Sequence, residues 1–569
     1  MTQDQVIQDQ TDSSRLDGDA GFAARSFLRS GGLTSDQVRR RPVIGIATSW
    51  SELNPCNLPT RPMAEAVKRG VAAAGGIALE FPTISLAESL IHPTTMLLRN
   101  LMAMDVEEMI SASPIDAVVL LGGCDKTVAA QLMGALSADK PALSLTTGPR
   151  PAGRWRGGEL TIDDSWRIAD ERRSGLLDDR AWHEVEGCIS PGPGVCNVMG
   201  TAVTLAMIAE ILGFAPPGSS LLPAGSPQRL ASAEQAGARA VELARDPVLP
   251  SRLVTREALT DAWRLVCATG GSTNAVIHLQ ALAGRAGVRL STRHLREASR
   301  TTPTLGQVRP NGPHTLADLH DEGGVPAVVR ELGPLLHLDR PTADGSNWRE
   351  VAAGTAPGPG RALRPAADPV HPHGAIAVLH GSLAPRSAVI KRSAASPRLL
   401  RHTGPALVFD GLADLRARID DPDLPVTADT VLVLRGAGPI GGPGMAEVGG
   451  LPIPAKLYRA GVRDMVRVSD ARMSGTAAGT VVLHVTPEAA VGGPLALVRD
   501  GDPIRLDVPA GTLDLLVDPD TLDRRARDTP PATAPRPARG YRRLYADHVG
   551  QADEGCDFDF LHATPEETP

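Results

Sequence analysis

Three side chains of different chemistry are adjacent in the segment LLGGCDKT, residues 120–127. Cys124 offers a sulfur ligand, Asp125 an oxygen ligand and Lys126 an amine. A thiolate suits a soft metal such as iron, whereas a carboxylate suits a hard ion such as magnesium. This segment could therefore bind two different metals side by side.

Lysine is rare in this chain, because nearly all of its 58 basic residues are arginine. The five lysines are Lys68, Lys126, Lys140, Lys391 and Lys456. An amine can lose its proton and react, which a guanidinium group cannot do. For any one of the five lysines, chance explains its presence as well as a function does. For Lys126, the adjacent Cys124 and Asp125 favour a chemical role.

Two further cysteines have a similar polar, glycine- or proline-containing setting, namely Cys56 in SELNPCN and Cys196 in GPGVCNVMG. An apolar helix is expected to begin near Asn197, which would put Cys196 at a helix N-terminus, where the dipole favours a thiolate. The remaining cysteines lack this setting and are expected to be small buried hydrophobic residues. They are Cys188, Cys267 and Cys556.

The spacing of Cys56, Cys124 and Cys196 is too long for a zinc finger or a ferredoxin-type motif. Three distant thiolates could instead hold an iron–sulfur cluster and leave one iron open to a substrate. Six cysteines in a chain of this length are too few for a disulfide framework, so a reducing compartment is expected.

The elements that must position these residues alternate between strand and helix. Strands are predicted at 41–48, 77–85 and 115–121, and helices at 61–76 and 95–113. This βαβ series implies a parallel sheet, and ligands gather beyond the carboxyl ends of such strands. Cys56, Glu88 and the Cys124–Lys126 segment follow the three strands in turn, so they should lie on one rim.

The second half of the chain reads as short strands separated by Gly, Pro and Asp, which predicts a β-barrel-like domain. The strands are expected at 375–381, 405–411, 430–436, 464–470, 479–485, 503–508 and 512–517. Residues 436–441 fit the dinucleotide pattern G-x-G-x-x-G, but prolines and glycines occupy the place where its helix should begin. We interpret this segment as a loop that presents Glu447 as an oxygen ligand; the alternative is an ordinary solvated glutamate.

The expected fold class is α/β, with an N-terminal parallel-sheet α/β domain and a C-terminal β-barrel-like domain. The boundaries predicted from composition are a flexible arm at 1–20, the α/β domain at 21–354, a Pro/Gly-rich connection at 355–373, the barrel-like domain at 374–535 and a C-terminal tail at 536–569.

Charge and hydropathy exclude two classes of partner. The net charge of -7 and the mixed acids and bases give no basic stripe for nucleic acid. The chain has no run of about 18 apolar residues, so no membrane span is expected. A cytoplasmic protein that acts on a small molecule, as a homodimer or homotetramer, is the expectation.

Six motifs in order resemble one enzyme family. They are NPCN, LLGGCDKT, GVCNVMGTA, GGSTNAVIHL, GPGMAEVG and VSDARMSGTAAGTVVLHVTPEAAVGGPLALVRDGD. The chain resembles the dehydratases that include dihydroxy-acid, sugar-acid (aldonate) and phosphogluconate dehydratases, from about Gly21 to Val517.

That resemblance implies a set of roles. Cys56, Cys124 and Cys196 would bind an iron–sulfur cluster, with [2Fe–2S] favoured and [4Fe–4S] as the alternative. Glu88, Asp125 and Glu447 would bind Mg²⁺, and a carbamylated Lys126 would join them. Carbamylation turns an amine into an anionic oxygen ligand, which arginine cannot become. Ser474 in ARMSGT would be the base, on the barrel-like domain, so the active site should form where the two domains face each other.

The implied reaction is removal of water from a 2,3-dihydroxy acid to give a 2-oxo acid. The motifs resemble the sugar-acid branch more than the branched-chain amino-acid branch, so a pentonate is the expected substrate type. Four residues depart from the family pattern and leave the choice of acid open. They are Pro59, Ser382, Arg386 and Ser387. A non-catalytic paralogue is the remaining alternative.

Overall fold

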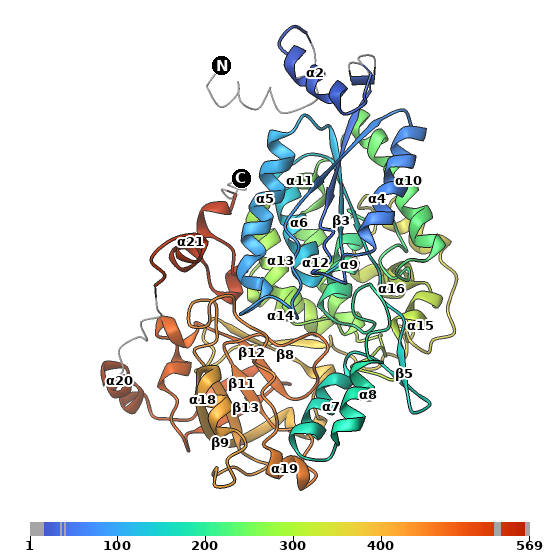
Figure 1. Ribbon diagram of the computed structural model, residues 1–569. Coiled ribbons are helices and arrows are strands. Elements are labelled where there is room, and N and C mark those ends of the chain that lie inside the picture. Colours follow the sequence, from blue (N-terminus) through green and yellow to red (C-terminus); the bar gives the residue numbers. More distant parts are fainter. Residues whose placement is uncertain (1–15, 17, 35–36, 39–40, 529–535, 564–569) are drawn as a thin grey trace.

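The protein forms an N-terminal part rich in helices and a C-terminal part built on one large sheet (Figure 1). The computed structural model describes residues 16, 18–34, 37–38, 41–528 and 536–563. The predicted arm at 1–20 lies almost entirely outside these residues. No helix within the described ranges is long and apolar enough to cross a membrane.

The N-terminal part contains a four-stranded parallel sheet in the order β2-β1-β3-β4. Its strands are β1 (Val43–Thr48), β2 (Ile77–Pro82), β3 (Ala117–Gly122) and β4 (Ala142–Thr146). A hairpin of β5 (Gly153–Trp155) and β6 (Gly158–Leu160) follows. The βαβ prediction is confirmed, with small differences at the ends of the elements.

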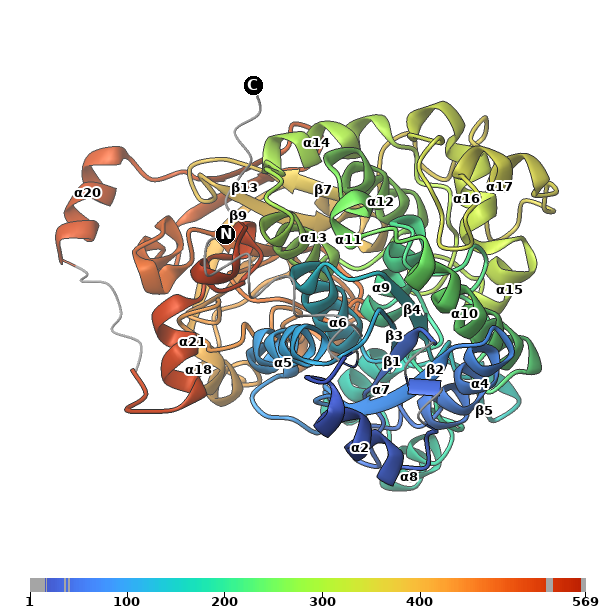
Figure 2. The same ribbon diagram turned by 90° about the horizontal axis from the view of Figure 1, so that it is seen from above.

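Helices cover both faces of this sheet. The helices of the N-terminal part are α2 (Phe22–Ser30), α4 (Thr60–Ala73), α5 (Arg99–Ala112), α6 (Asp125–Ala138), α7 (Asp164–Arg173), α8 (Asp179–Glu186), α9 (Thr201–Ile211), α10 (Pro227–Arg245), α11 (Pro250–Leu253), α12 (Arg256–Thr269), α13 (Asn274–Arg285), α14 (Thr292–Thr301), α15 (Leu316–Asp321), α16 (Gly324–Leu332) and α17 (Trp348–Gly354). Viewed from above, α4 and α10 lie on one side of the strands and α5 and α6 on the other (Figure 2).

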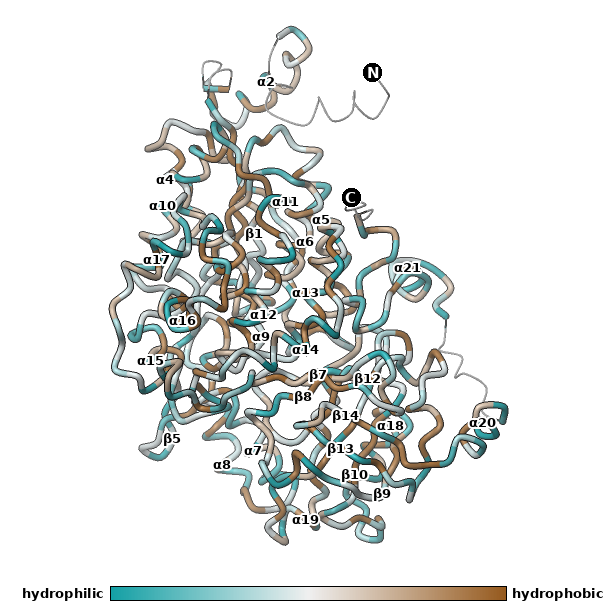
Figure 3. The backbone as a smooth tube through the Cα atoms, turned by 180° about the vertical axis from the view of Figure 1, so that it is seen from behind, coloured by the Kyte–Doolittle hydropathy of each residue, from teal (hydrophilic) through white to brown (hydrophobic). Residues whose placement is uncertain are grey.

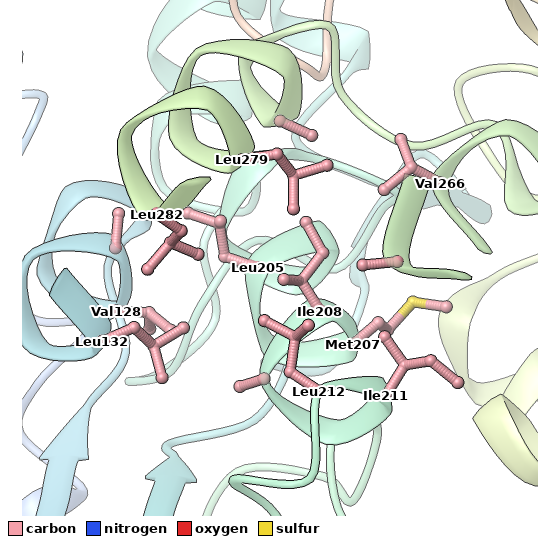
Figure 4. Close-up of a cluster of buried hydrophobic side chains, with 14 of the residues drawn as sticks. Val128, Leu132, Leu205, Met207, Ile208, Ile211, Leu212, Val266, Leu279 and Leu282 are labelled. Carbon is pink, nitrogen blue, oxygen red and sulfur yellow. The ribbon is translucent and has the colours of Figure 1, made fainter. Parts of the chain in front are cut away.

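Residues of β3 alternate between two cores, as side chains of a strand must. Val118 and Leu120 pack with α5 and α6, whereas Val119 and Leu121 pack with α4 and α10. The larger core continues through α6, α9, α12 and α13 (Figure 4). In the tube coloured by hydropathy, hydrophobic residues concentrate along β1, whereas α20 at the edge is hydrophilic (Figure 3).

The C-terminal part is an eight-stranded sheet that nearly closes into a barrel. Its strands are β7 (Ile376–Leu379), β8 (Ser387–Lys391), β9 (Arg401–Asp410), β10 (Val431–Arg435), β11 (Arg467–Ser469), β12 (Val481–Thr486), β13 (Pro503–Asp507) and β14 (Thr512–Leu515), in the order β14-β13-β9-β10-β11-β12-β8-β7. His380, which follows β7, bridges to Thr512 in β14 and brings the two ends together. The predicted barrel-like architecture is confirmed.

The seven strands predicted in this half all form, and β8 is the one that the sequence prediction missed. Its short apolar core of three residues lies between a proline-containing loop and Lys391, so the local pattern is weak. Antiparallel pairing with both β7 and β12 makes it a strand. The helices of this half are α18 (Gly411–Arg418), α19 (Ala455–Arg459), α20 (Pro519–Asp528) and α21 (Tyr541–His548).

The segment at 541–561 returns from the barrel to the N-terminal part, where α21 lies beside α5 (Figure 1). The Tyr541 hydroxyl donates to the Leu97 carbonyl at 2.7 Å, and the Arg99 guanidinium donates to the Cys556 carbonyl at 2.9 Å. Tyr545 also accepts a hydrogen bond from the Gly444 N–H at 3.1 Å. This segment therefore joins the two parts close to the loop that carries Glu447.

Candidate active site

The predicted site residues meet in one cavity of about 500 Å³ between the two parts of the molecule. Its lining includes Cys56, Glu88, Cys124, Asp125, Cys196, Glu447 and Ser474. Lys126 is fully buried beneath them and contacts three of the carboxylates. The sequence predicts Cys56, Glu88 and the Cys124–Lys126 segment on one rim and Ser474 on the facing domain, and the structure brings these residues together at this cavity.

Two loops bring the Cys56 and Cys124 thiols together. The Asn57 Oδ1 atom accepts hydrogen bonds from the N–H groups of Gly123, at 2.8 Å, and Cys124, at 3.3 Å. A Cβ atom on Gly123 would lie only 2.6 Å from the Cys56 carbonyl oxygen, so a side chain there would force the loops apart. Gly123 of GGC and Asn57 of NPCN therefore hold the two loops, and with them the two thiols, close together.

The thiols differ in acidity. A hydrogen bond from the Cys124 thiol, helped by the Arg150 guanidinium 3.7 Å away, lowers the pKa of Cys56 to about 7 against the opposing effect of burial. Burial raises the pKa of Cys196 to about 12. A metal bound here would displace the thiol protons, because the thiolate is the ligand form and all three thiols face one cavity.

The prediction that Cys196 begins a helix is wrong. The helix α9 starts at Thr201 after Gly200, and Cys196 lies in the preceding loop. The helix does not begin directly after Asn197, because the Met199 N–H donates to the Arg309 carbonyl of another segment at 2.8 Å. Cys124 instead occupies the N-cap position of α6, so the helix dipole acts on that thiol.

Three carboxylates surround the Lys126 ammonium, and we call these four residues the oxygen cluster. The Nζ atom lies 2.5 Å from Asp125 Oδ2, 3.2 Å from Glu447 Oε1 and 3.4 Å from Glu88 Oε2. Burial would raise the pKa of Glu88, but the charges of Lys126 and Arg472 lower it to about 2. Burial raises the pKa of Asp125, and the neighbouring carboxylates add to that effect.

Residues that the sequence did not single out hold the oxygen cluster in place. Arg472 Nη1 donates to Glu447 Oε1 at 2.8 Å, and Asn274 Nδ2 donates to the same oxygen at 2.9 Å. The Thr94 hydroxyl donates to Glu88 Oε1 at 2.7 Å and accepts from Arg472 Nη2 at 3.1 Å. Arg472 and Asn274 lie in the motifs SDARMSGT and GGSTN, so the motifs were visible but their roles were not.

The cavity offers two kinds of donor atom, namely the sulfur atoms of three thiols and the oxygen atoms of three carboxylates. In the described part of the chain, no three His, Cys, Asp or Glu side chains are arranged to hold a single ion by themselves. The ammonium of Lys126 stands where the carboxylate oxygens converge, and the three thiols face a cavity large enough for a cluster. Carbamylation of Lys126 would place four anionic groups around Arg472, and a bound divalent cation would offset the excess negative charge.

Ser474 lies in the turn after β11, where its oxygen accepts hydrogen bonds. The Trp166 indole N–H donates to Thr476 Oγ1 at 2.9 Å, and the hydroxyls of Thr476 and Ser474 are hydrogen-bonded at 2.9 Å, where either can be the donor. The Thr476 N–H donates to Ser474 Oγ at 3.3 Å. The N–H donor, and the Thr476 hydroxyl when it donates, would favour an anionic Ser474 oxygen.

The turn at Ser474 is packed tightly on both sides. A Cβ atom on Gly475 would lie 2.8 Å from the Ser272 side chain and from the Thr201 nitrogen. On the other side, the buried Lys391 Nζ donates to the Gly475 carbonyl at 3.4 Å. Burial lowers the pKa of Lys391 to about 7. These contacts fix the position of the Ser474 side chain relative to the cavity.

The loop of residues 436–449 does not begin a nucleotide-binding helix, as predicted from its prolines and glycines. Buried Asp470 accepts from the N–H groups of Gly436 and Ala437, and buried Glu488 accepts from those of Ile440 and Gly441. The backbone donors that would bind a pyrophosphate are therefore already used, and the loop presents Glu447 to the cavity.

The four departures from the family pattern lie outside the described cavity lining. Pro59 is the N-cap of α4. Ser382 bonds to Leu515 and Asp514 at the edge of the barrel, and Ser387 is in β8. Arg386 forms ion pairs with Asp553 and Glu554 of the returning segment.

Replacement of Cys56, Cys124 or Cys196 by serine, one at a time, is expected to remove iron and sulfide and to bleach the visible absorbance. A serine hydroxyl is a poor ligand for iron where a thiolate is a good one. Iron and sulfide analysis of anaerobically purified protein measures the effect. Cys188→Ser, Cys267→Ser and Cys556→Ser are the controls and should keep the spectrum. Full iron in all three site variants would show that these cysteines do not hold a cluster.

Comparisons with known proteins agree with the motifs. The family model described as dihydroxy-acid/6-phosphogluconate dehydratase N-terminal matches residues 41–351, and its C-terminal counterpart matches 361–556. The chain is 47% identical to a 6-deoxy-6-sulfo-D-gluconate dehydratase of Pseudomonas putida, over 95% of this chain and 94% of the relative. It is 48% identical to an L-arabonate dehydratase of Azospirillum brasilense, over 96% and 95%. It is 41% identical to dihydroxy-acid dehydratase 1 of Nocardia farcinica, over 95% and 97%.

Proposed function

This chain belongs to the dihydroxy-acid/6-phosphogluconate dehydratase family, and we propose that it dehydrates a sugar acid, such as a pentonate, to the 2-oxo-3-deoxy acid. The family and the relatives make it a hydro-lyase that acts on a dihydroxy acid. The observation that carries the proposal is the single cavity that holds three thiols, the oxygen cluster and Ser474.

In this proposal the residues divide the chemistry between two sides of the cavity. Ser474 takes the proton from C2, the C3–O bond breaks, and the departing hydroxide takes a proton to become water. The enol that remains gains a proton at C3 and loses the proton of its C2 hydroxyl, which gives the 2-oxo acid. The Thr476 hydroxyl and N–H stabilise the Ser474 oxygen while it acts as a base.

The metal groups proposed for this site are an iron–sulfur cluster on Cys56, Cys124 and Cys196 and Mg²⁺ on the oxygen cluster, with Lys126 carbamylated. When bound, they supply Lewis acids for the C3 hydroxyl and for the charge that develops near C1 and C2. The chain's own part is to hold the ligand atoms at fixed places, which Asn57, Arg472 and Asn274 do through the hydrogen bonds described above.

The names of the relatives support a sugar acid over a branched-chain acid, because the two more similar ones named here act on sugar acids. The cavity wall also carries the side chains of Ser165, Ser190 and Arg150. Hydroxyl and guanidinium groups of this kind can bond the extra hydroxyls of a sugar acid, which an alkyl chain lacks.

A substrate panel tests the proposal. Protein purified without oxygen and supplied with Mg²⁺ is incubated with pentonates, hexonates and 2,3-dihydroxyisovalerate, and 2-oxo acid formation is followed. The kcat/KM for the best sugar acid should exceed that for the branched-chain acid by about 10²-fold or more, since buried polar groups left unpaired cost that much. A preference for the branched-chain acid would instead favour the second candidate, a dihydroxy-acid dehydratase, which the similarity to the Nocardia relative supports.

A further inference from the structure

A second cavity, of about 330 Å³, lies between α14, the connection at 371–373, the end of β8 and the turn between β13 and β14. It shares no lining residue with the cavity that holds Ser474. Its wall is rich in basic groups, and no Asp or Glu lines it among the residues that the structure describes. The basic residues are Arg296, Arg300, Arg392, His371 and His373.

Arg392 is the residue that needs explanation. Its Nε atom is buried without a hydrogen-bond partner, and no salt bridge is formed by its guanidinium group within the described ranges. Burial lowers the pKa of Arg392, which means that the charged form is poorly solvated there. Two fully buried arginines contact a carboxylate, since Arg285 contacts Asp557 and Arg472 contacts Glu447, and the buried Arg99 and Arg229 donate to backbone carbonyls. Arg392 is only half-buried, but its buried Nε–H has no partner, and an anion in the cavity would supply the missing acceptor.

The nearest acidic residues in sequence have cations of their own. Glu297 lies 3.9 Å from Arg300 on the exposed side of α14, and Asp507 lies 3.5 Å from Arg401. Arg296 donates to the Ala510 carbonyl at 2.7 Å and has no carboxylate partner in the described chain. The cavity therefore keeps an excess of positive charge.

The two histidines add hydrogen-bond donors. The His373 N–H donates to His371 Nδ1 at 3.2 Å, so a neutral His371 carries its proton on Nε2. His373 Nδ1 lies 2.9 Å from the Arg300 carbonyl, to which it donates. Their side chains line the same cavity as the Arg392 guanidinium.

We propose that this cavity binds a small oxyanion, the phosphate or carboxylate group of a metabolite, through Arg392 with Arg296 and Arg300. The planar guanidinium fork matches both groups in a bidentate manner. The site is separate from the catalytic cavity, and the proposal does not rest on the identity of the substrate. Arg392 directly follows Lys391, the last residue of β8. The Lys391 amine contacts the Gly475 carbonyl in the Ser474 turn, so the residue proposed to bind the anion is next in sequence to the one that supports this turn.

Equilibrium dialysis of the holoenzyme with labelled inorganic phosphate, and separately with labelled malonate, tests the proposal and distinguishes phosphate from carboxylate. Saturable binding of one anion per chain is expected for at least one of them. Arg392→Met should weaken it by about tenfold or more, the loss expected for one charge-assisted hydrogen bond. Arg398→Met is the matched control, because Arg398 is exposed and lies outside the cavity lining.

Two further measurements keep the result unambiguous. Arg300→Met, at an exposed position on α14, should also weaken binding even if Arg392→Met folds poorly. The bound anion should leave the substrate KM unchanged, because the two cavities share no residue. The proposal is overturned if neither anion binds, if Arg392→Met and Arg300→Met both bind as well as the parent, or if the anion competes with substrate, which would place it in the catalytic cavity.

Discussion

Lys126→Arg is expected to abolish turnover while the iron and sulfide content stays close to that of the parent. Arginine keeps a positive charge at the centre of the oxygen cluster, where Lys126 lies 2.5 Å from Asp125, but a guanidinium group cannot become a carbamate. The loss in kcat should be at least ~100-fold, because even residues that only support a metal ligand cost ~10–100-fold when replaced. Steady-state kinetics and metal analysis measure the two effects separately.

Lys68→Arg is the matched control for this substitution. Lys68 is on α4 and pairs with Glu65 and Glu80 at the surface, where arginine can take its place, so turnover should not change. After bicarbonate has been removed from the parent protein, adding it back should restore turnover. The same addition should have no effect on Lys126→Arg. A crystal structure grown with bicarbonate and Mg²⁺ that showed a free ammonium far from any metal would refute the carbamate.

The prediction from sequence was most accurate where a residue directly follows a strand. Cys56, Glu88 and Cys124 were placed on one rim because parallel strands end at the same edge, and they line one cavity. The start of α9 was misplaced because an apolar stretch predicts burial without specifying where the backbone becomes helical. Local pattern therefore located the site better than it located the ends of the elements.

Local sequence patterns do not predict contacts between segments that are far apart in the sequence. Arg472 contacts Glu447 and Thr94, residues 25 and 378 positions away, and Trp166 reaches Thr476 across 310 positions. Such pairs depend on how the barrel docks on the parallel-sheet part, which hydrophobic periodicity does not encode. The strand β8 was missed for a related reason, since its two neighbours in the sheet make it a strand.

Ser474→Ala is expected to keep the fold, the cluster spectrum and bound Mg²⁺ but to lose turnover. The Ser474 oxygen accepts from Thr476 and faces the same cavity as the thiols and the oxygen cluster, whereas an alanine methyl group cannot take a proton. Loss of a general base costs about 10²–10⁴-fold in rate. Single-turnover kinetics with the best acid of the panel measures this loss without interference from product release.

The result distinguishes a base from a residue that only shapes the turn. Exchange of the C2 proton with solvent deuterium should disappear in Ser474→Ala, since a residue that only held the turn would leave that exchange in place. Ser382→Ala, at the barrel edge beside Leu515, removes a comparable hydroxyl outside the cavity and should leave turnover and exchange unchanged. If Ser474→Ala retained nearly the parental rate, the base would have to be another group that lines the cavity. Thr476, whose hydroxyl lies 2.9 Å from Ser474 Oγ, would then be the first candidate to test.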